Sequence, residues 1–126
     1  MFKKQVFILT LVSLFTFLSP QKSFAASPGA SFRLDPTRRF VFLTLTNLQS
    51  VARVSYVLTY ETRGVTKGFE GGFRTFGRQR RSVRRQILGT CSSGRCVYHT
   101  NPHGFQLDVT FYLKSGGTTT ASQTLP

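Results

Sequence analysis

The sequence predicts an all-β protein: a single antiparallel β-sandwich, with a small open β-barrel as the alternative. Six or seven short stretches rich in β-branched and aromatic residues follow one another along the chain. Turn-forming residues separate them at intervals of roughly 8–12 residues, which is typical of sandwiches and barrels. No stretch has the apolar periodicity of an amphipathic helix. These observations together favour one sandwich domain.

The first 25 residues have the three-part layout of a secretory signal peptide. Lys3 and Lys4 precede an uncharged, mostly apolar run over 6–18, and a small-x-small cleavage site ends at Ala25. At about 1.5 Å per residue this run would extend about 20 Å, less than the roughly 30 Å of a bilayer core. We expect residues 1–25 to be removed and the protein to be secreted, periplasmic or at the cell surface, without an integral membrane segment. An uncleaved N-terminal anchor is the alternative.

Residues 26–30 are predicted to be a flexible leader, and residues 31–126 the single β-sandwich domain. One core is what a chain of this size can bury. The first predicted strand is Ser31–Leu34, and it ends at Asp35-Pro36 because proline cannot donate to a ladder.

Two alternating strands are predicted next. Phe40–Thr46 places its aliphatic residues on one face and its phenylalanines and threonines on the other. Residues 47–50 are predicted to form a turn between the two strands. Residues 52–60 then alternate as a half-buried strand with one wet face. Its predicted inner face consists of Ala52, Val54, Tyr56, Leu58 and Tyr60.

The middle of the chain is rich in glycine and arginine. Gly64–Gly77 contains five glycines and three phenylalanines, and we interpret it as a loop or a short irregular hairpin. Arg78–Arg85 has too few apolar positions for a core strand, so a loop or an edge strand is expected there.

The C-terminal third is predicted to contain two hairpins. Gln86–Thr90 and Cys96–Thr100 form the first around the two cysteines, and Asn101–Gly104 has turn chemistry. Phe105–Lys114 is the most regular strand, and a Ser-Gly-Gly turn joins it to Thr118–Leu125, a threonine-rich edge strand. Such an edge can pair with a strand of a partner protein.

The strand with Tyr56 and Tyr60, the segment Ile87–Cys91 and the final Phe105–Lys114 hairpin resemble an immunoglobulin-like or fibronectin-III-like module of a bacterial secreted protein. The resemblance implies a sandwich architecture and a role in adhesion or scaffolding, and it carries over no catalytic residue. The chain departs from immunoglobulin domains because it has no Trp and its two cysteines are too close to bridge two sheets.

The charge is strongly positive, with 17 Lys and Arg against four Asp and Glu. Guanidinium groups beside aromatic rings are typical of polyanion surfaces, because they pair bidentately with phosphate or sulfate. Two interpretations of the basic run stay open. One is a solvated basic loop that protects an edge strand from aggregation, and the other is a contact for nucleic acid, anionic glycan, wall polymer or a membrane surface. The candidate residues are Arg74, Arg78, Arg80, Arg81, Arg84, Arg85 and Arg95.

Cys91 and Cys96 are predicted to form a disulfide across a hairpin, as exported proteins favour. Zinc bound by Cys91, Cys96, His99 and His103 is the alternative, although the two-residue spacing between Cys96 and His99 is unlike that of zinc fingers. Redox-active thiols are the remaining interpretation.

No enzyme class fits the sequence. The four acidic residues contain no recognisable pair for glycoside chemistry, and neither a Gly-x-Ser-x-Gly elbow nor a phosphate loop is present. We predict an exported, non-enzymatic binding or surface-interaction module without a cofactor. An extracellular polyanion-binding protein is the first alternative, and a zinc or redox site at Cys91–His103 is the second.

Overall fold

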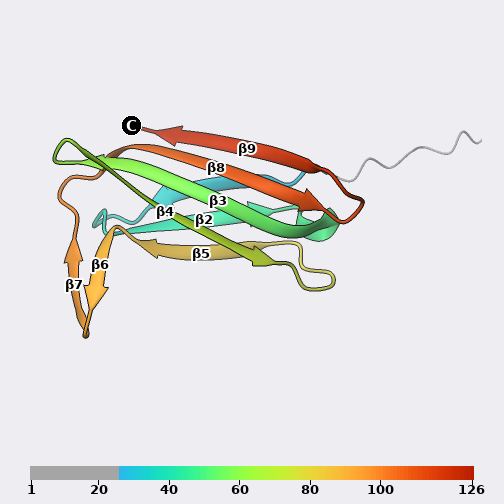
Figure 1. The fold of residues 1–126 in the computed structure, drawn as a ribbon, viewed down its shortest axis with the longest axis horizontal. Helices are drawn as coiled ribbons and strands as arrows, with labels where there is room; N and C mark the ends of the chain where they lie inside the picture. The colour runs from blue at the N-terminus through green and yellow to red at the C-terminus, as the bar shows by residue number, and fades with distance from the viewer. Residues whose placement is uncertain (1–25) are drawn as a thin grey trace, which may run out of the picture.

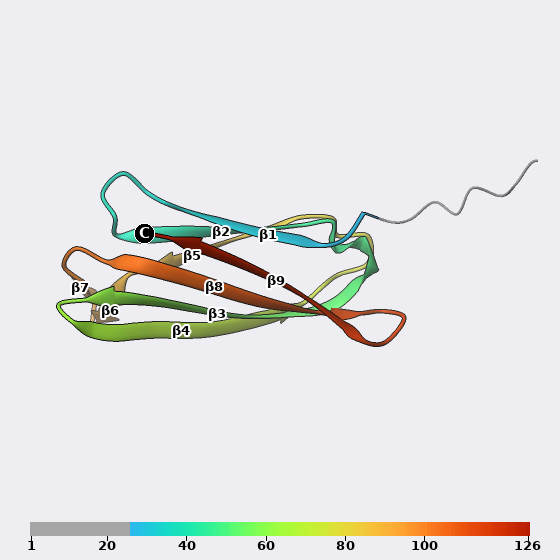
Figure 2. The ribbon, with the colours of Figure 1, turned by 90° about the horizontal axis from the view of Figure 1, so that it is seen from above.

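The protein is an antiparallel β-sandwich, which confirms the predicted fold class (Figures 1 and 2). The structure is a computed structural model in which residues 26–126 are described, and the predicted signal peptide lies outside them. The first sheet has the order β1-β2-β5, with β1 at Gly29–Leu34, β2 at Phe40–Thr46 and β5 at Ser82–Ile87. The second has the order β4-β3-β8-β9, with β4 at Val65–Arg74, β3 at Val51–Thr62, β8 at His103–Leu113 and β9 at Thr118–Leu125.

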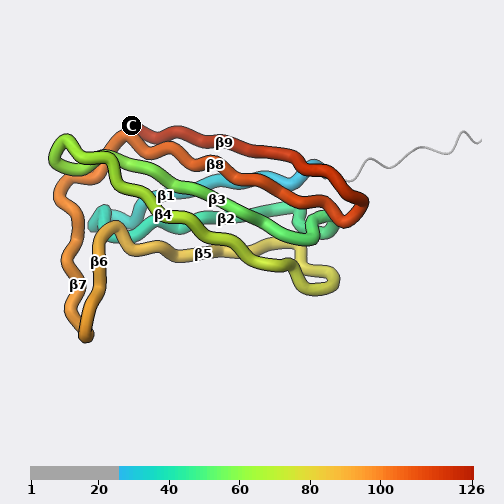
Figure 3. Tube along the Cα trace, in the orientation of Figure 1, coloured from blue at the N-terminus to red at the C-terminus, as the bar shows by residue number. Residues whose placement is uncertain are grey.

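Two further strands form a separate hairpin, β6 (Gly89–Ser92) with β7 (Arg95–Tyr98). This hairpin projects from one end of the sandwich (Figure 3). It is inserted between β5 of the first sheet and β8 of the second, and the strand order of the two sheets is consistent with an immunoglobulin-like module. Within 26–126 there is no helix whose length and apolarity would suffice to cross a bilayer.

The core consists of the inward side chains of both sheets, with alternate residues buried along each central strand. On β2 the aliphatic face is inside, as predicted, and on β8 the buried face runs from Phe105 to Phe111. Leu48 and Leu88 lie outside the strands yet are fully buried. The most deeply buried large side chains are Phe105, Phe111, Leu45, Leu48, Leu58, Leu88 and Leu107.

Side-chain contacts close the two open sides of the sandwich. On one side the Gln123 Oε1 of β9 accepts the Phe32 N–H of β1 at 2.9 Å. On the other side the Arg84 guanidinium of β5 lies 4.3 Å from the centre of the Phe73 ring of β4. These contacts give an edge backbone group and an edge arginine a partner in the facing sheet.

The prediction of a loop or short irregular hairpin at residues 64–77 was wrong, because β4 occupies ten of these residues. Two of the glycines of β4, Gly71 and Gly72, lie where neighbouring atoms leave no room for a side chain in its present surroundings. A Cβ at Gly71 would lie 2.4 Å from the Tyr56 ring, and one at Gly72 would lie 2.7 Å from the Val54 carbonyl oxygen. Glycine within a strand marks this kind of close approach.

The start of β1 and the facing of Ala52 also differ from prediction. β1 begins at Gly29, before the predicted Ser31, because Gly29 and Ala30 already pair with the end of β2. The last two residues of the predicted leader therefore belong to the sheet. Ala52 was predicted to face inward but is exposed, because a register shift between Val51 and Arg53 gives the buried position to Val51.

The segment Gln86–Thr90 was predicted as one strand but is divided at Leu88. β5 ends at Ile87, Leu88 turns into the core, and β6 starts in a new direction at Gly89. This division produces the separate hairpin and raises the number of strands in residues 26–126 above the six or seven predicted.

Candidate polyanion-binding surface

The outer face of the β1-β2-β5 sheet carries aromatic residues because its inner face holds the aliphatic ones. Val41, Leu43 and Leu45 point into the core, so Phe40 and Phe42 point outward and are only half-buried. Arginines from the neighbouring strands lie beside these rings. Arg33 of β1 and Arg85 of β5 are both register partners of Phe42, one on each side.

Three arginines stack on this outer face. The Arg33 guanidinium carbon lies 4.5 Å from the centre of the Phe42 ring, and that of Arg85 lies 4.8 Å from the Phe40 ring. Phe40 meets Tyr98 of β7 edge-to-face at 6.0 Å, and Arg39 lies 4.6 Å above the Tyr98 ring. We call this set the arginine–aromatic ladder; its members are Arg33, Phe42, Arg85, Phe40, Tyr98 and Arg39.

Stacking prepares these guanidinium groups to bind anions. Each cation–π contact at an exposed site is worth about 0.5–1 kcal/mol and restrains a long side chain before any ligand arrives. The ring covers one face of the guanidinium, while its N–H edge stays available for bidentate bonds to phosphate, sulfate or carboxylate oxygens. The ladder therefore has the chemistry of an anion-binding surface.

Within residues 26–126 no carboxylate forms an ion pair with these cations. Among residues 26–126 the structure records one ion pair, between His103 and Glu61 at 3.5 Å, and no arginine takes part. Asp108 accepts hydrogen bonds from Gln106 and Ser122 on the other sheet, and Glu70 lies on β4 of that sheet. The arginines of the ladder are exposed and take part in no ion pair within residues 26–126.

The fourth acidic residue, Asp35, holds the turn that positions two ladder residues. Its Oδ1 accepts the backbone N–H groups of Arg39 and Phe40, both at 2.8 Å. Its Oδ2 accepts the Thr37 hydroxyl and the Thr37 N–H. The Thr37 hydroxyl bond, followed by the three backbone N–H bonds, outweighs the opposing effect of desolvation and lowers the pKa of Asp35 from 3.8 to about 2.

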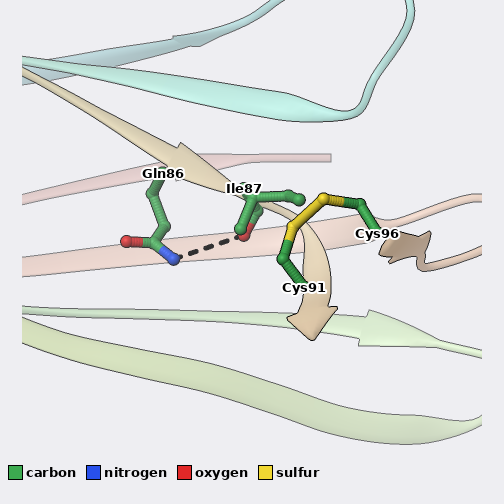
Figure 4. The surroundings of a disulfide bond; sticks show 4 residues. All are labelled: Gln86, Ile87, Cys91 and Cys96. Atoms are coloured by element: carbon green, nitrogen blue, oxygen red, sulfur yellow. Dashed lines mark hydrogen bonds between the residues drawn. A yellow bond between two sulfur atoms is a disulfide. The ribbon is translucent and has the colours of Figure 1, made fainter. Parts of the chain in front are cut away.

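A groove lies beside the ladder, between the end of the sheet and the β6–β7 hairpin. It has a volume of about 330 Å³ and is lined by Phe40, Arg85, Gln86, Ile87, Tyr98 and the disulfide. Figure 4 shows the disulfide next to Ile87, with the Gln86 Nε2 donating to the Ile87 carbonyl oxygen at 3.4 Å. Two rings, an arginine and an amide thus surround a space that a ligand group can enter.

The base of the hairpin is fixed to the sandwich. The Leu88 N–H donates to the Arg39 carbonyl oxygen, and the His99 N–H donates to that of Leu88, both at 2.8 Å. The Tyr60 hydroxyl lies 2.7 Å from the His99 Nδ1, and burial raises the pKa of Tyr60. Tyr98 therefore has a defined position relative to Phe40.

The sequence-predicted arginines do not form one patch. Arg85 belongs to the ladder, whereas Arg84 stacks on Phe73 at the sandwich edge. Arg74 pairs with Arg53 on the four-stranded sheet, and Arg95 lies at the tip of the β6–β7 hairpin. Arg78, Arg80 and Arg81 lie in the loop between β4 and β5.

Sequence reasoning missed most of the ladder. Its hypothesis followed the density of arginines along the chain, and the ladder instead joins residues from β1, β2, β5 and β7. One signal was present in the alternation of β2, which places Phe40 and Phe42 opposite the aliphatic face. Large rings on the face that the core does not use are a sequence sign of a contact surface.

The two cysteines form the predicted disulfide. Cys91 and Cys96 are direct register partners in the hairpin, with their Cα atoms 4.0 Å apart. Both sulfurs are therefore used in this pair. The His99 Nδ1 lies against the Tyr60 hydroxyl, and His103 lies against Glu61. Among residues 26–126 no group of three or more His, Cys, Asp or Glu residues is arranged to hold a metal ion.

Among known proteins, one solved structure is similar to the chain. No protein family matches the chain, and no curated protein does. Among solved structures the chain is similar to the solution structure of CsgH from R. palustris, with 10% identity over 78% of this chain and 90% of that chain. The TM-score of this match is 0.44.

Proposed function

We propose that the protein is an exported, non-enzymatic binding module that holds an anionic polymer on the arginine–aromatic ladder. The observation that carries this proposal is the stacking of three exposed arginines on neighbouring aromatic rings, none of which forms an ion pair with a carboxylate of residues 26–126. Several restrained arginines on one surface favour a ligand with repeated negative charges, because each anionic group can bind the N–H edge of one guanidinium. Nucleic acids, anionic glycans and wall polymers share this chemistry.

The register of the sheet favours an extended ligand. Arg33, Phe42 and Arg85 form a row across three adjacent strands, so the two arginines are about 10 Å apart at the backbone. The row continues through Phe40 to Tyr98 and the groove. A polymer lying across the strands would contact all three arginines, whereas a small anion would contact one.

The proposal is tested by retention of the exported protein on heparin and on single-stranded DNA across a salt series. The ladder variant Arg33→Gln, Arg39→Gln, Arg85→Gln is compared with a loop variant of equal charge, Arg78→Gln, Arg80→Gln, Arg81→Gln. On single-stranded DNA the ladder variant should lower the slope of log K against log salt by roughly 2, at about 0.7 for each lost phosphate contact. The loop variant should keep most of that slope.

The two columns also distinguish the ligands. Stronger retention on DNA identifies a nucleic acid, since bases add stacking that a glycan lacks, and stronger retention on heparin favours a sulfated or uronic glycan. If both variants lose the same retention, only net charge matters and the ladder is not the binding surface.

A further inference from the structure

An exposed phenylalanine marks the loop between β4 and β5, residues 75–81. The Phe76 side chain is 80% exposed, more than any other large apolar side chain in residues 26–126. The loop lies at the end of the sandwich opposite the β6–β7 hairpin and outside the ladder (Figures 1 and 2). A large apolar side chain that is exposed at the tip of a loop is typical of a contact site for a partner.

Hydrogen bonds hold this loop in one conformation. The Thr75 N–H donates to the Ala52 carbonyl oxygen at 3.1 Å, and the Gln79 N–H donates to that of Phe76 at 2.8 Å. The Gln79 Oε1 accepts the Phe76 N–H at 3.3 Å, and the Arg80 carbonyl oxygen accepts the Leu48 N–H at 3.1 Å. The outward position of Phe76 is therefore built into the fold.

Basic residues lie on or next to the loop that carries the exposed ring. Arg74, Arg78, Arg80 and Arg81 are all exposed, and the Lys114 Nζ donates to the Gly77 carbonyl oxygen at 3.1 Å. The loop sequence contains no acidic residue. An exposed apolar side chain on a loop rich in cations is typical of peripheral proteins that bind an anionic lipid surface.

We propose that this loop docks the protein on anionic lipid bilayers. Phe76 enters the boundary between headgroups and acyl chains, while the arginines and Lys114 contact lipid phosphates. A nucleic acid partner is disfavoured, because a single exposed ring provides no succession of stacking positions. The docked protein keeps the ladder on its side, where a polymer still has access to it.

The absence of tryptophan from the sequence permits a direct test. The variant Phe76→Trp carries one tryptophan, at the loop tip, and is added to vesicles of phosphatidylcholine and phosphatidylglycerol in equal parts. We expect its fluorescence to shift to the blue and to be quenched by lipids brominated on the acyl chains. No shift on these vesicles, or a shift produced by single-stranded DNA alone, would overturn the proposal.

Binding of charge-matched variants to the same vesicles separates docking from simple attraction. Phe76→Ser should weaken binding by roughly ten- to a hundredfold, the usual cost of removing a buried aromatic ring. The loop variant Arg78→Gln, Arg80→Gln, Arg81→Gln should bind more weakly than Arg63→Gln, Lys67→Gln, Arg95→Gln, which loses equal charge elsewhere. Equal binding by these two variants, or unchanged binding by Phe76→Ser, contradicts docking. Circular dichroism checks that each variant is folded.

Discussion

Asp35 is a single side chain on which two ladder residues depend. Its carboxylate accepts hydrogen bonds from the backbone N–H groups of Arg39 and Phe40, and these bonds fix the position of both residues at the end of the β1–β2 turn. Because the pKa of Asp35 is about 2 in the folded protein and near 3.9 in an unfolded chain, folding favours the ionised form. The resulting stability is present above about pH 4 and is lost as the pH falls through 2.

We predict that Asp35→Ala lowers the melting temperature at neutral pH. The difference from the unsubstituted protein should shrink between about pH 4 and pH 2, because Asp35 takes up a proton in the unfolded chain below about pH 4 but in the folded protein only near pH 2. Thermal unfolding followed by circular dichroism at several pH values measures this difference. Asp108→Ala is the control, because that carboxylate lies on the other sheet. A difference that stays constant down to pH 2 would contradict the assigned role of Asp35.

At the scale of elements, β4 depends on side chains of its neighbour β3, because its own glycines have none that could pack. Glycines contribute no side chain to a sheet, and the Tyr56 ring covers the position above Gly71. The same ring meets Phe69 edge-to-face at 6.4 Å. An aromatic residue that shields a cross-strand glycine stabilises a strand that propensity alone would not form.

Gly71→Ala tests this packing. In an open strand the exchange would stabilise by about 0.5–1 kcal/mol, because alanine loses less backbone entropy on folding. Here the new Cβ would overlap the outer end of the Tyr56 ring, so the ring must turn away from β4. We predict a loss of about 0.5–1.5 kcal/mol, the cost of displacing a side chain from its rotamer. Chemical denaturation measures the change.

The control is the same substitution in a Tyr56→Ser background. With the ring removed, Gly71→Ala should become neutral or stabilising, so the two sites should be strongly coupled in a double-mutant cycle. An equal effect of Gly71→Ala in both backgrounds would mean that the ring does not limit the space at Gly71.

The same element explains what sequence could and could not predict about the fold. β2 and β8 were predictable because their apolar residues alternate with a period of two, which a sheet with one buried face requires. β9 has no such alternation and was predicted from the Ser-Gly-Gly turn before it and from its threonines. β4 was missed because three of its ten residues are glycine, and Lys67 and Gly71 separate its apolar residues. The end of β5 before Leu88 could not be predicted either, because a leucine within an apolar run carries no sequence signal for a turn of the backbone.

On the scale of the whole molecule, the charge is divided among separate surfaces. Net charge predicted an anionic partner, and this required no structure. Placing the contact did require it, because Arg33 and Arg85 are far apart in sequence and meet only through β2. Counting arginines along the chain instead pointed to residues 74–85. Of these, Arg85 belongs to the ladder, whereas Arg78, Arg80 and Arg81 lie in the loop with Phe76.

The most direct test of the ladder is a titration of the nitrogen-15-labelled protein with a heparin oligosaccharide and with a single-stranded oligonucleotide, followed by amide chemical shifts. The ladder predicts that the largest shifts fall on β1, β2, β5 and Tyr98, and that they vanish in the ladder variant. Shifts centred on residues 78–81, or spread evenly over all basic segments, would contradict the proposed binding surface.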